Sequence, residues 1–176
     1  QTSTLPTVDS GAGATGLVAQ AGKYLTFELA SEVYGLEILK VQEIIGMMAV
    51  TRVPRTPDFV RGVINLRGKV IPVVDLRLKF RLAAQKDTEK TCIIVVQVLR
   101  DKSEVTMGII VDEVSEVVDV AGDQIEPPPS FGSAVETDFI LGMGKVNQKV
   151  VMLLDVDKVL SGKEFTLINQ MAGNEA

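Results

Sequence analysis

The chain has 176 residues and a formal net charge of −5, and it contains no histidine, no tryptophan and one cysteine. The lack of histidine excludes Ser-His-Asp and Cys-His catalysis, imidazole metal ligands and histidine pH switches. A single cysteine excludes an internal disulfide framework and a thiolate metal cluster. No apolar stretch approaches the roughly 18 residues that span a bilayer, and no secretory signal opens the chain. We expect a soluble globular protein without a metal or a cofactor.

The charges are distributed unevenly along the chain. The segment 52–81 holds eight basic and two acidic residues, whereas the segment 101–138 holds ten acidic residues and one lysine. Two interpretations fit this split: two solvated faces, or a polar molecule whose ends attract different partners or each other. The acidic balance and the lack of interleaved aromatic residues argue against nucleic-acid binding.

The patterns along the chain are typical of strands between two flexible tails. Residues 1–22 are rich in Thr, Ser, Gly and Ala, which predicts an N-terminal tail, and residues 169–176 predict a C-terminal one. Apolar and polar residues alternate over 24–29, as in a half-buried strand. The apolar runs 92–98 and 108–111 predict strands that are covered on both faces.

A hairpin is predicted in the first half of the chain. Residues 63–66 and 70–74 flank Arg67-Gly68, where Gly68 should adopt a positive φ. Pro72 cannot donate a hydrogen bond to a ladder, so we expect an edge or a bulge there.

Helix is expected only in short pieces, at 76–82 and 156–160. Residues 111–120 fit a helical stripe of apolar residues, but their density of valine favours a strand.

An internal repeat runs through the sequence. An offset of 80 aligns Phe59–Leu76 with Phe139–Val156, and an offset of 73 aligns Gly35–Ile38 with Gly108–Val111. The first strands of the two copies align at an offset of about 68. Rising offsets are expected when the second copy has longer loops. The chain is therefore interpreted as a duplication.

Each copy has about five short strands, and a unit of that size is only marginally stable by itself. We therefore expect a mostly β fold of two five-stranded β-barrels related by a pseudo-twofold, with short helices. The two lobes should interleave roughly over 23–85 and 90–165, within one domain of residues 23–168. One face of the strands would fill each barrel, and the other would pack lobe on lobe.

Few residues suggest catalysis. Asp75 and Asp155 occupy matching places in the repeat and could act as a general acid and base. The favoured interpretation is that each caps the turn that follows it. Cys92 lies in an apolar strand without a basic neighbour, which indicates a core thiol.

Several residues could bind a partner protein instead. The segment around Ile38 is richer in apolar residues than a half-buried strand requires, and most of these should be core. Val41 and Glu43 are expected at the lip of a groove between the lobes. Arg67, at a hairpin tip, could capture a partner's carboxylate or be an ordinary turn residue. Phe131 follows three prolines and is either a plug or an anchor for another subunit.

The sequence resembles the CheW family of bacterial chemotaxis coupling proteins. The resemblance covers about residues 23–165 and is carried by five strings: I-L-K-V-Q-E-I-I at 38–45, T-R-V-P at 51–54, F-V-R-G-V-I-N-L-R-G-K-V-I-P-V-V-D-L-R at 59–77, G-I-I-V-D-E-V-S-E-V at 108–117 and L-G-M-G at 141–144. It implies two SH3-like barrels and a non-catalytic adaptor that joins chemoreceptor tips to the regulatory domain of the histidine kinase CheA. Such an adaptor works in the cytoplasm, at the inner face of the membrane through receptor arrays, where further copies can join rings.

The resemblance also assigns residues. Phe131 matches an aromatic residue that contacts neighbours in rings, and the positions tied to receptor or kinase binding are Ile38, Val41, Glu43, Gly62, Arg67 and Gly68. Two alternatives stay open: the same domain forms part of CheA and of CheV, and an Asp-dependent hydrolase could use Asp75 and Asp155. The sequence shows no kinase or phosphoacceptor segment before the unit and no receiver domain after it, so we expect a free-standing adaptor unless the chain is part of a longer protein.

Overall fold

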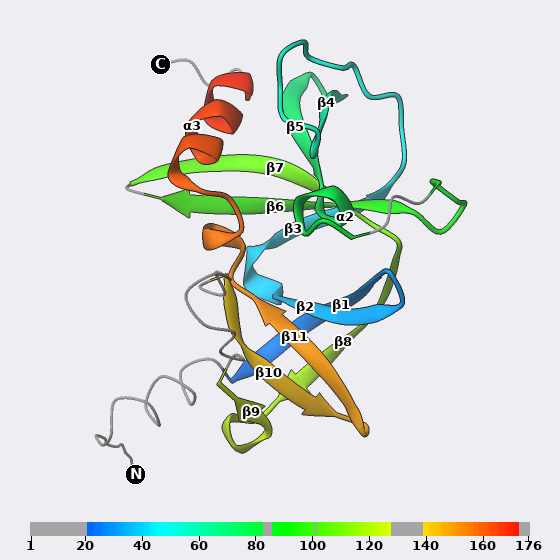
Figure 1. The fold of residues 1–176 in the computed structure, drawn as a ribbon, viewed down its shortest axis with the longest axis vertical. Helices are drawn as coiled ribbons and strands as arrows, with labels where there is room; N and C mark the ends of the chain where they lie inside the picture. The colour runs from blue at the N-terminus through cyan, green and yellow to red at the C-terminus, as the bar shows by residue number, and fades with distance from the viewer. Residues whose placement is uncertain (1–20, 83–85, 101, 128–138, 173–176) are drawn as a thin grey trace.

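The computed structural model describes residues 21–82, 86–100, 102–127 and 139–172. They form two antiparallel-rich sheets stacked along the long axis of the molecule (Figure 1). We name the two layers lobe A and lobe B. Lobe A contains, in spatial order, β8 (Glu113–Val120), β1 (Gly22–Leu29), β2 (Glu32–Glu37), β11 (Lys149–Leu154), β10 (Ile140–Val146) and β9 (Ile125–Glu126). Lobe B contains β3 (Val41–Gly46), β6 (Cys92–Arg100), β7 (Ser103–Val111), β5 (Lys69–Asp75) and β4 (Val60–Leu66).

Helices are short except for the last one. Two are α-helical, α2 (Leu76–Lys79) and α3 (Gly162–Met171). Three single turns are 3-10 helices: η1 (Ile38–Lys40), η2 (Gly122–Gln124) and η3 (Val156–Lys158). The strand predicted at 111–120 is confirmed as β8, apart from the break at Asp112.

The two sheets confirm the duplication. When each strand is replaced by its repeat equivalent, the order β3-β6-β7-β5-β4 becomes β8-β1-β2-β11-β10, which is the order found in lobe A. Even the irregularities repeat, because β4–β5 is bulged between Val60 and Gly62 and β10–β11 is bulged between Ile140 and Gly142. This shared topology agrees with two SH3-like β-barrels.

The interleaving of the repeats is an exchange of strands. The first repeat gives β1 and β2 to lobe A and β3, β4 and β5 to lobe B. The second repeat gives β6 and β7 to lobe B and β8, β10 and β11 to lobe A. Neither repeat forms a lobe by itself, and the chain crosses between lobes at η1 and again at Asp112.

The core has the three parts that two packed barrels require. A small cluster that includes Ile64 and Ile93 fills lobe B, and another that includes Tyr24 and Leu153 fills lobe A. The largest cluster draws on both lobes, from Phe27 and others in lobe A to strands β6 and β7 in lobe B, and forms the seam between them. Four rings, Phe27, Tyr34, Phe80 and Phe139, stack across this seam at centroid distances of 6.0, 5.9 and 5.1 Å. The prediction that both strand faces are buried is confirmed.

The C-terminal end departs from the prediction. Residues 169–171 belong to α3 and not to a flexible tail, and the helix packs Phe165 and Ile168 into the seam. Ser161 and Glu164 form a capping box at its start. The Ser161 amide donates to Glu164 Oε1 at 2.8 Å, and the Glu164 amide donates to Ser161 Oγ at 3.2 Å.

Pro72 is also placed differently. β5 is an inner strand of lobe B, but its parallel pairing with β7 begins only at Val73. The pairing between β5 and β7 therefore requires no backbone N–H at Pro72, which explains how an inner strand accepts proline.

Candidate functional site

Closure of lobe B brings two predicted binding segments together. Beyond β3, Thr51 pairs with Val63 of β4 through two backbone hydrogen bonds of 2.8 Å, which joins the two outer strands of the sheet. Gly62 is buried beside this bridge with φ +140°. A Cβ there would lie 2.0 Å from the Thr51 carbonyl oxygen. Gly62 thus allows the barrel to close.

Glu43 and Arg67 meet at this closure. The Arg67 guanidinium forms an ion pair with the Glu43 carboxylate, although the two residues lie on β3 and on the β4–β5 turn. The turn is confirmed, with φ +53° at Arg67 and +88° at Gly68, and Asn65 Oδ1 accepts a 2.8 Å bond from the Gly68 amide. The Arg67 side chain is 66% exposed. In the free chain, Arg67 thus holds a carboxylate of its own chain.

A second group lies at the crossover η1. Ile38 and Val41 are half-buried and pack on the seam, whereas Leu39 between them is 95% exposed. The sequence analysis missed Leu39. The signal in the sequence is the apolar pair Ile38-Leu39. A three-residue turn cannot bury both of these side chains, so one of them must be exposed.

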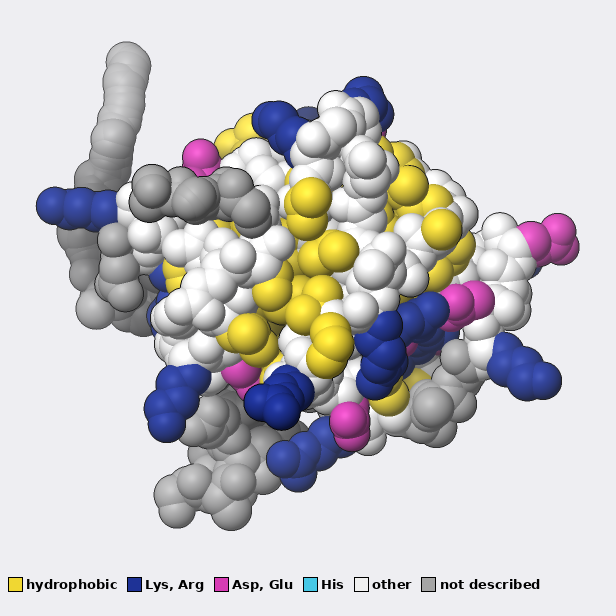
Figure 2. All heavy atoms as spheres, turned by 90° about the horizontal axis from the view of Figure 1, so that it is seen from above, with side chains coloured by type: hydrophobic (Ala, Val, Ile, Leu, Met, Phe, Trp, Pro, Cys, Tyr) yellow, Lys and Arg dark blue, Asp and Glu magenta, His cyan; other side chains and the backbone are white. Residues whose placement is uncertain are grey.

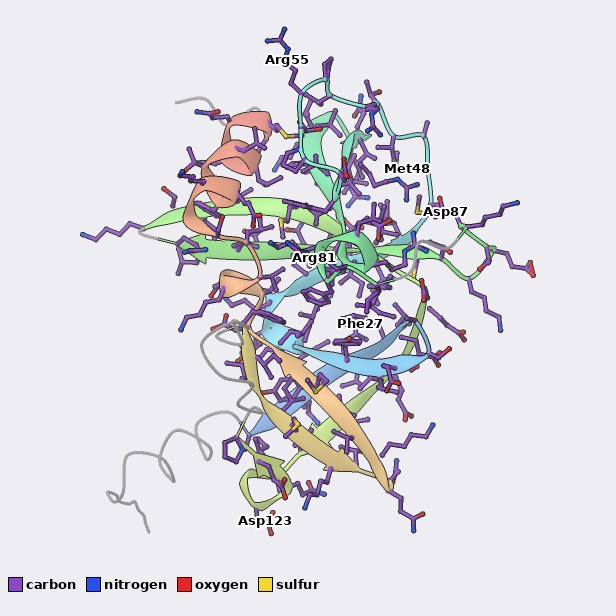
Figure 3. The ribbon with its side chains drawn as sticks, viewed as in Figure 1. Phe27, Met48, Arg55, Arg81, Asp87 and Asp123 are labelled. Atoms are coloured by element: carbon purple, nitrogen blue, oxygen red, sulfur yellow. The ribbon has the colours of Figure 1, made fainter. Side chains whose placement is uncertain are left out.

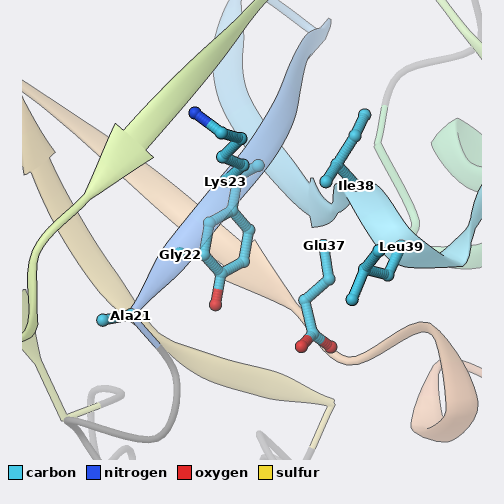
Figure 4. A pocket seen from close by; sticks show the side chains of 7 residues that line it. Ala21, Gly22, Lys23, Glu37, Ile38 and Leu39 are labelled. Carbon is cyan, nitrogen blue, oxygen red and sulfur yellow. The ribbon is translucent and has the colours of Figure 1, made fainter.

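A shallow pocket opens beside η1. It has a volume of about 280 Å³ and lies between the start of β1, with Ala21 and Gly22, and the end of β2 at Glu37 with Ile38 and Leu39 of η1 (Figure 4). The pocket and the exposed Leu39 form one surface beside the crossover, which also holds the charged residues Lys23 and Glu37. Its apolar part, at Ile38 and Leu39, could receive an apolar side chain of a partner.

Glu37, which lines this pocket, lies close to a second carboxylate, that of Asp155. Burial raises the pKa of Glu37, and the nearby carboxylate of Asp155 raises it further, while Lys40 opposes both effects. Burial likewise raises the pKa of Asp155, and it raises the pKa of Tyr24 to about 12. The folded state therefore disfavours the negative charge at Glu37.

We expect Glu37→Gln to stabilise the protein at neutral pH. The pKa of Glu37 is higher in the folded than in the unfolded state, so its negative charge destabilises the fold. This destabilisation is complete at a pH above the folded pKa, and it vanishes at a pH below the unfolded pKa of about 4.3. Urea unfolding should show a gain at pH 7 that is lost near pH 4. Glu32→Gln, an exposed change on the same strand, is the control. A gain of equal size at both pH values would contradict the prediction.

The paired aspartates act as caps. Asp75 accepts a 3.0 Å bond from the backbone N–H of Arg77 at the start of α2, and Asp155 accepts a 3.1 Å bond from that of Asp157 at η3. Asp75 is also bound by the guanidinium groups of Arg61 and Arg77. This arrangement favours the capping interpretation over that of a hydrolase. Cys92 is half-buried, and burial raises the pKa of its thiol, as expected for an unreactive core thiol.

The basic and the acidic segment reach opposite ends of the molecule. Arg55 lies at the free end of lobe B and Asp123 at the free end of lobe A (Figure 3). Seen from the lobe B end, Lys and Arg side chains surround a central apolar area (Figure 2). Part of the basic stretch is nevertheless internal, because Arg61, Arg77 and Lys79 form ion pairs with Asp or Glu within the fold. Five basic residues of the stretch stay exposed: Arg52, Arg55, Arg67, Lys69 and Arg81.

The predicted site residues therefore fall into two groups. Glu43, Gly62, Arg67 and Gly68 share the closure of lobe B, and Ile38 and Val41 share the crossover with the exposed Leu39. Phe131 lies outside the described residues.

Within the described residues, no three His, Cys, Asp or Glu side chains gather in a way that could hold a metal ion. None of their helices has the length and apolar character needed to cross a membrane.

The chain is similar to known chemotaxis proteins along most of its length. A family model described as a CheW-like domain matches residues 23–164. The chemotaxis protein CheW of Klebsiella aerogenes is 40% identical over 168 residues, 96% of this chain and 96% of that protein. CheW of Helicobacter pylori is 35% identical over 143 residues, 81% of this chain and 83% of that protein.

A solved structure agrees with these relatives. The crystal structure of the scaffolding protein TtCheW from Thermoanaerobacter tengcongensis superimposes with a TM-score of 0.72 at 34% identity, over 82% of this chain and 96% of that one. The exchanged double barrel and the sequence similarity lead to the same conclusion. This chain belongs to the CheW family.

Proposed function

We propose that this chain is a non-catalytic adaptor of bacterial chemotaxis, which couples the cytoplasmic tips of transmembrane chemoreceptors to the regulatory domain of the histidine kinase CheA. The observation that carries the proposal is that the whole double barrel, and not one part of it, is similar to CheW proteins. The description of a structural relative as a scaffolding protein supports the same role.

The geometry supports a docking role for the two residue groups. At the lobe B closure, an exposed arginine and a half-buried glutamate offer a charge pair that a partner could re-form with its own side chains. At the crossover, Leu39 and the neighbouring pocket offer an apolar anchor point. Two chemically different surfaces suit a protein that must hold two partners at once.

The assignment of residues to partners is part of the proposal. Ile38, Val41, Glu43, Arg67 and Gly68 would contact receptor or kinase. Gly62 would act through the barrel closure, because it is buried. Phe131 would contact neighbouring copies in rings. The protein would work in the cytoplasm, bound to the inner face of the membrane through receptor arrays, and would need no cofactor.

Arg67→Ala should weaken capture of the partners by about tenfold or more without unfolding the protein. An interface anchor typically contributes 1–2 kcal/mol or more to binding, whereas an exposed ion pair contributes only about 0–1 kcal/mol to stability. Co-sedimentation with receptor tips and CheA measures the captured amounts, and urea unfolding measures stability.

Arg55→Ala is the matched control. Arg55 is also an exposed arginine at a positive φ, +65°, in lobe B, and it forms no ion pair with any described residue. Its loss should leave both partners in the pellet. If receptor tips and CheA also sediment with Arg67→Ala in wild-type amounts, then Arg67 is not a binding residue.

A further inference from the structure

The two repeats carry opposite charges at one equivalent position. Two residues after the capping aspartate, the first repeat has Arg77 and the second has Asp157, at the offset of 80. Each of these side chains contacts the segment in which the chain crosses from one lobe to the other. The same contact is thus made twice with reversed polarity.

The first contact is centred on Arg77, which follows β5 of lobe B and is only 2% exposed. Its Nη1 lies 3.1 Å from Oδ1 of Asp112, the residue between β7 and β8. The other oxygen, Asp112 Oδ2, accepts a 2.8 Å bond from the amide of Ala30 in the β1–β2 turn of lobe A. The Asp112 amide donates to the Glu28 carbonyl at 3.0 Å. Arg77, Asp112 and Ala30 therefore link lobe B to lobe A.

The second contact is centred on Asp157, which follows β11 of lobe A. Its Oδ2 lies 2.7 Å from Nζ of Lys40, the last residue of the crossover η1. Its Oδ1 accepts a 2.8 Å bond from the amide of Leu99 in β6 of lobe B. Asp157, Lys40 and Leu99 therefore link lobe A to lobe B. The side chains of Lys40 and Asp157 are 27% and 25% exposed, so this contact is more accessible than the first.

The two contacts lie at opposite ends of the seam. In Figure 1, η1 and η3 lie on one side of the molecule, and the β1–β2 turn and the crossover from β7 to β8 lie on the other. The seam between the sites consists of apolar side chains, which attract without a preferred direction. Ion pairs and hydrogen bonds with defined geometry can supply the direction that apolar packing lacks.

We propose that Arg77–Asp112 and Lys40–Asp157 are two matched clamps that set the angle between the lobes, and that Lys40 and Asp157 are positioning residues for the η1 surface. Lys40 directly follows Leu39, and the Lys40–Asp157 clamp fixes the crossover η1 that exposes the Leu39 side chain. Loss of the clamp would let this turn and the lobe angle relax together. The statement on the η1 surface rests on the proposed function, whereas the statement on the lobe angle does not.

Residual dipolar couplings of the backbone amides test the lobe angle without any partner. The couplings of each lobe give its own alignment, and comparing the two gives their relative orientation. We expect Lys40→Met and Asp112→Asn to change the angle or to lower the apparent order of one lobe. Asn at 112 keeps an acceptor for the Ala30 amide and loses only the charge that pairs with Arg77.

Two variants control the test. Lys40→Arg keeps the cation and should keep the wild-type angle, and Lys163→Met removes an exposed lysine that makes no ion pair with any described residue and should change nothing. Because Lys40 is partly exposed, Lys40→Met should fold even if Asp112→Asn does not. A wild-type angle and order in Lys40→Met would overturn the proposal.

A binding arm separates this proposal from the proposed function. Lys40→Met should lower capture of receptor tips or CheA several-fold at an almost unchanged unfolding midpoint, and Lys40→Arg should restore it. If the wild type captures neither partner, the proposed function fails while the lobe angle remains a valid result. If Lys40→Met binds like the wild type although its angle has changed, the positioning role is wrong.

Discussion

Gly62→Ala is expected to lower the free energy of unfolding by roughly 3–5 kcal/mol, which is a large part of the stability of a typical domain. The new Cβ would lie 2.0 Å from the carbonyl oxygen of Thr51 and 2.9 Å from Cα of Arg52. Both atoms belong to the backbone, so no side chain can rotate away. The φ of +140° adds a conformation that alanine rarely adopts. Barrel closure and the alanine side chain exclude each other.

Urea unfolding of Gly62→Ala and Gly68→Ala side by side measures this effect. Gly68 also has a positive φ, +88°, but its Cβ would meet nothing within 4 Å, so only backbone strain of about 1–2 kcal/mol should remain. The prediction also implies that Gly62→Ala loses partner binding through the fold. Equal stability of the two variants would show that the strands around Thr51 can move apart at little cost.

Arg77→Met is expected to cost roughly 3–5 kcal/mol, because it leaves a buried carboxylate without its main partner. Arg77 binds Asp75 through Nε and Nη2 at 3.0 Å each, and both side chains are almost fully buried. Asp75 keeps only Arg61 at 3.1 Å and its cap hydrogen bond. Methionine fills part of the volume but cannot neutralise the charge.

The double variant Arg77→Met, Asp75→Asn separates charge from packing. Asparagine can still accept the cap hydrogen bond, so the double variant should lose clearly less stability than Arg77→Met alone. The free energies of unfolding in urea of the wild type, the two single variants and the double variant complete this double-mutant cycle. If the losses at the two positions simply add, the buried charge is not the cause of the instability.

The local structure could be read from local sequence. The hairpin at Arg67-Gly68, the short helix after Asp75 and the strand at β8 depend on neighbouring residues, and all three are confirmed. The seam was predictable as well, because strands that are apolar on both faces must bury both faces.

Which strands the two repeats exchange could not be read in this way. An internal repeat tells which strands are equivalent, but a strand such as β3 can pair within its own repeat or with the other repeat at the same register. The choice depends on contacts between distant segments, such as Glu43 with Val95 of β6. Sequence periodicity carries no information on such partners.

The helix α3 was missed although its signal was present. Ser161 and Glu164 have the spacing of a capping box, and Phe165 and Ile168 follow at helical spacing. The polar residues that follow Ile168 resemble a tail, although the first of them belong to the helix. A capping box directly before a pair of apolar residues outweighs such an impression.

The candidate site was predicted as a list of residues and not as an arrangement. Glu43 and Arg67 were named separately, while their ion pair depends on the closure of lobe B by Thr51 and Val63. Leu39 is exposed only because η1 is a single turn between two lobes. Both features belong to tertiary structure, which explains why the sequence could not predict them.

The adaptor role is tested most directly by a bridging assay. Receptor tips presented on vesicles are sedimented with CheA, with and without this chain, at protein concentrations where CheA alone stays in the supernatant. We expect CheA to enter the pellet together with this chain, and to do so to a much smaller extent with Arg67→Ala. CheA that sediments equally well without the chain, or a chain that stays in the supernatant when both partners are present, would contradict it.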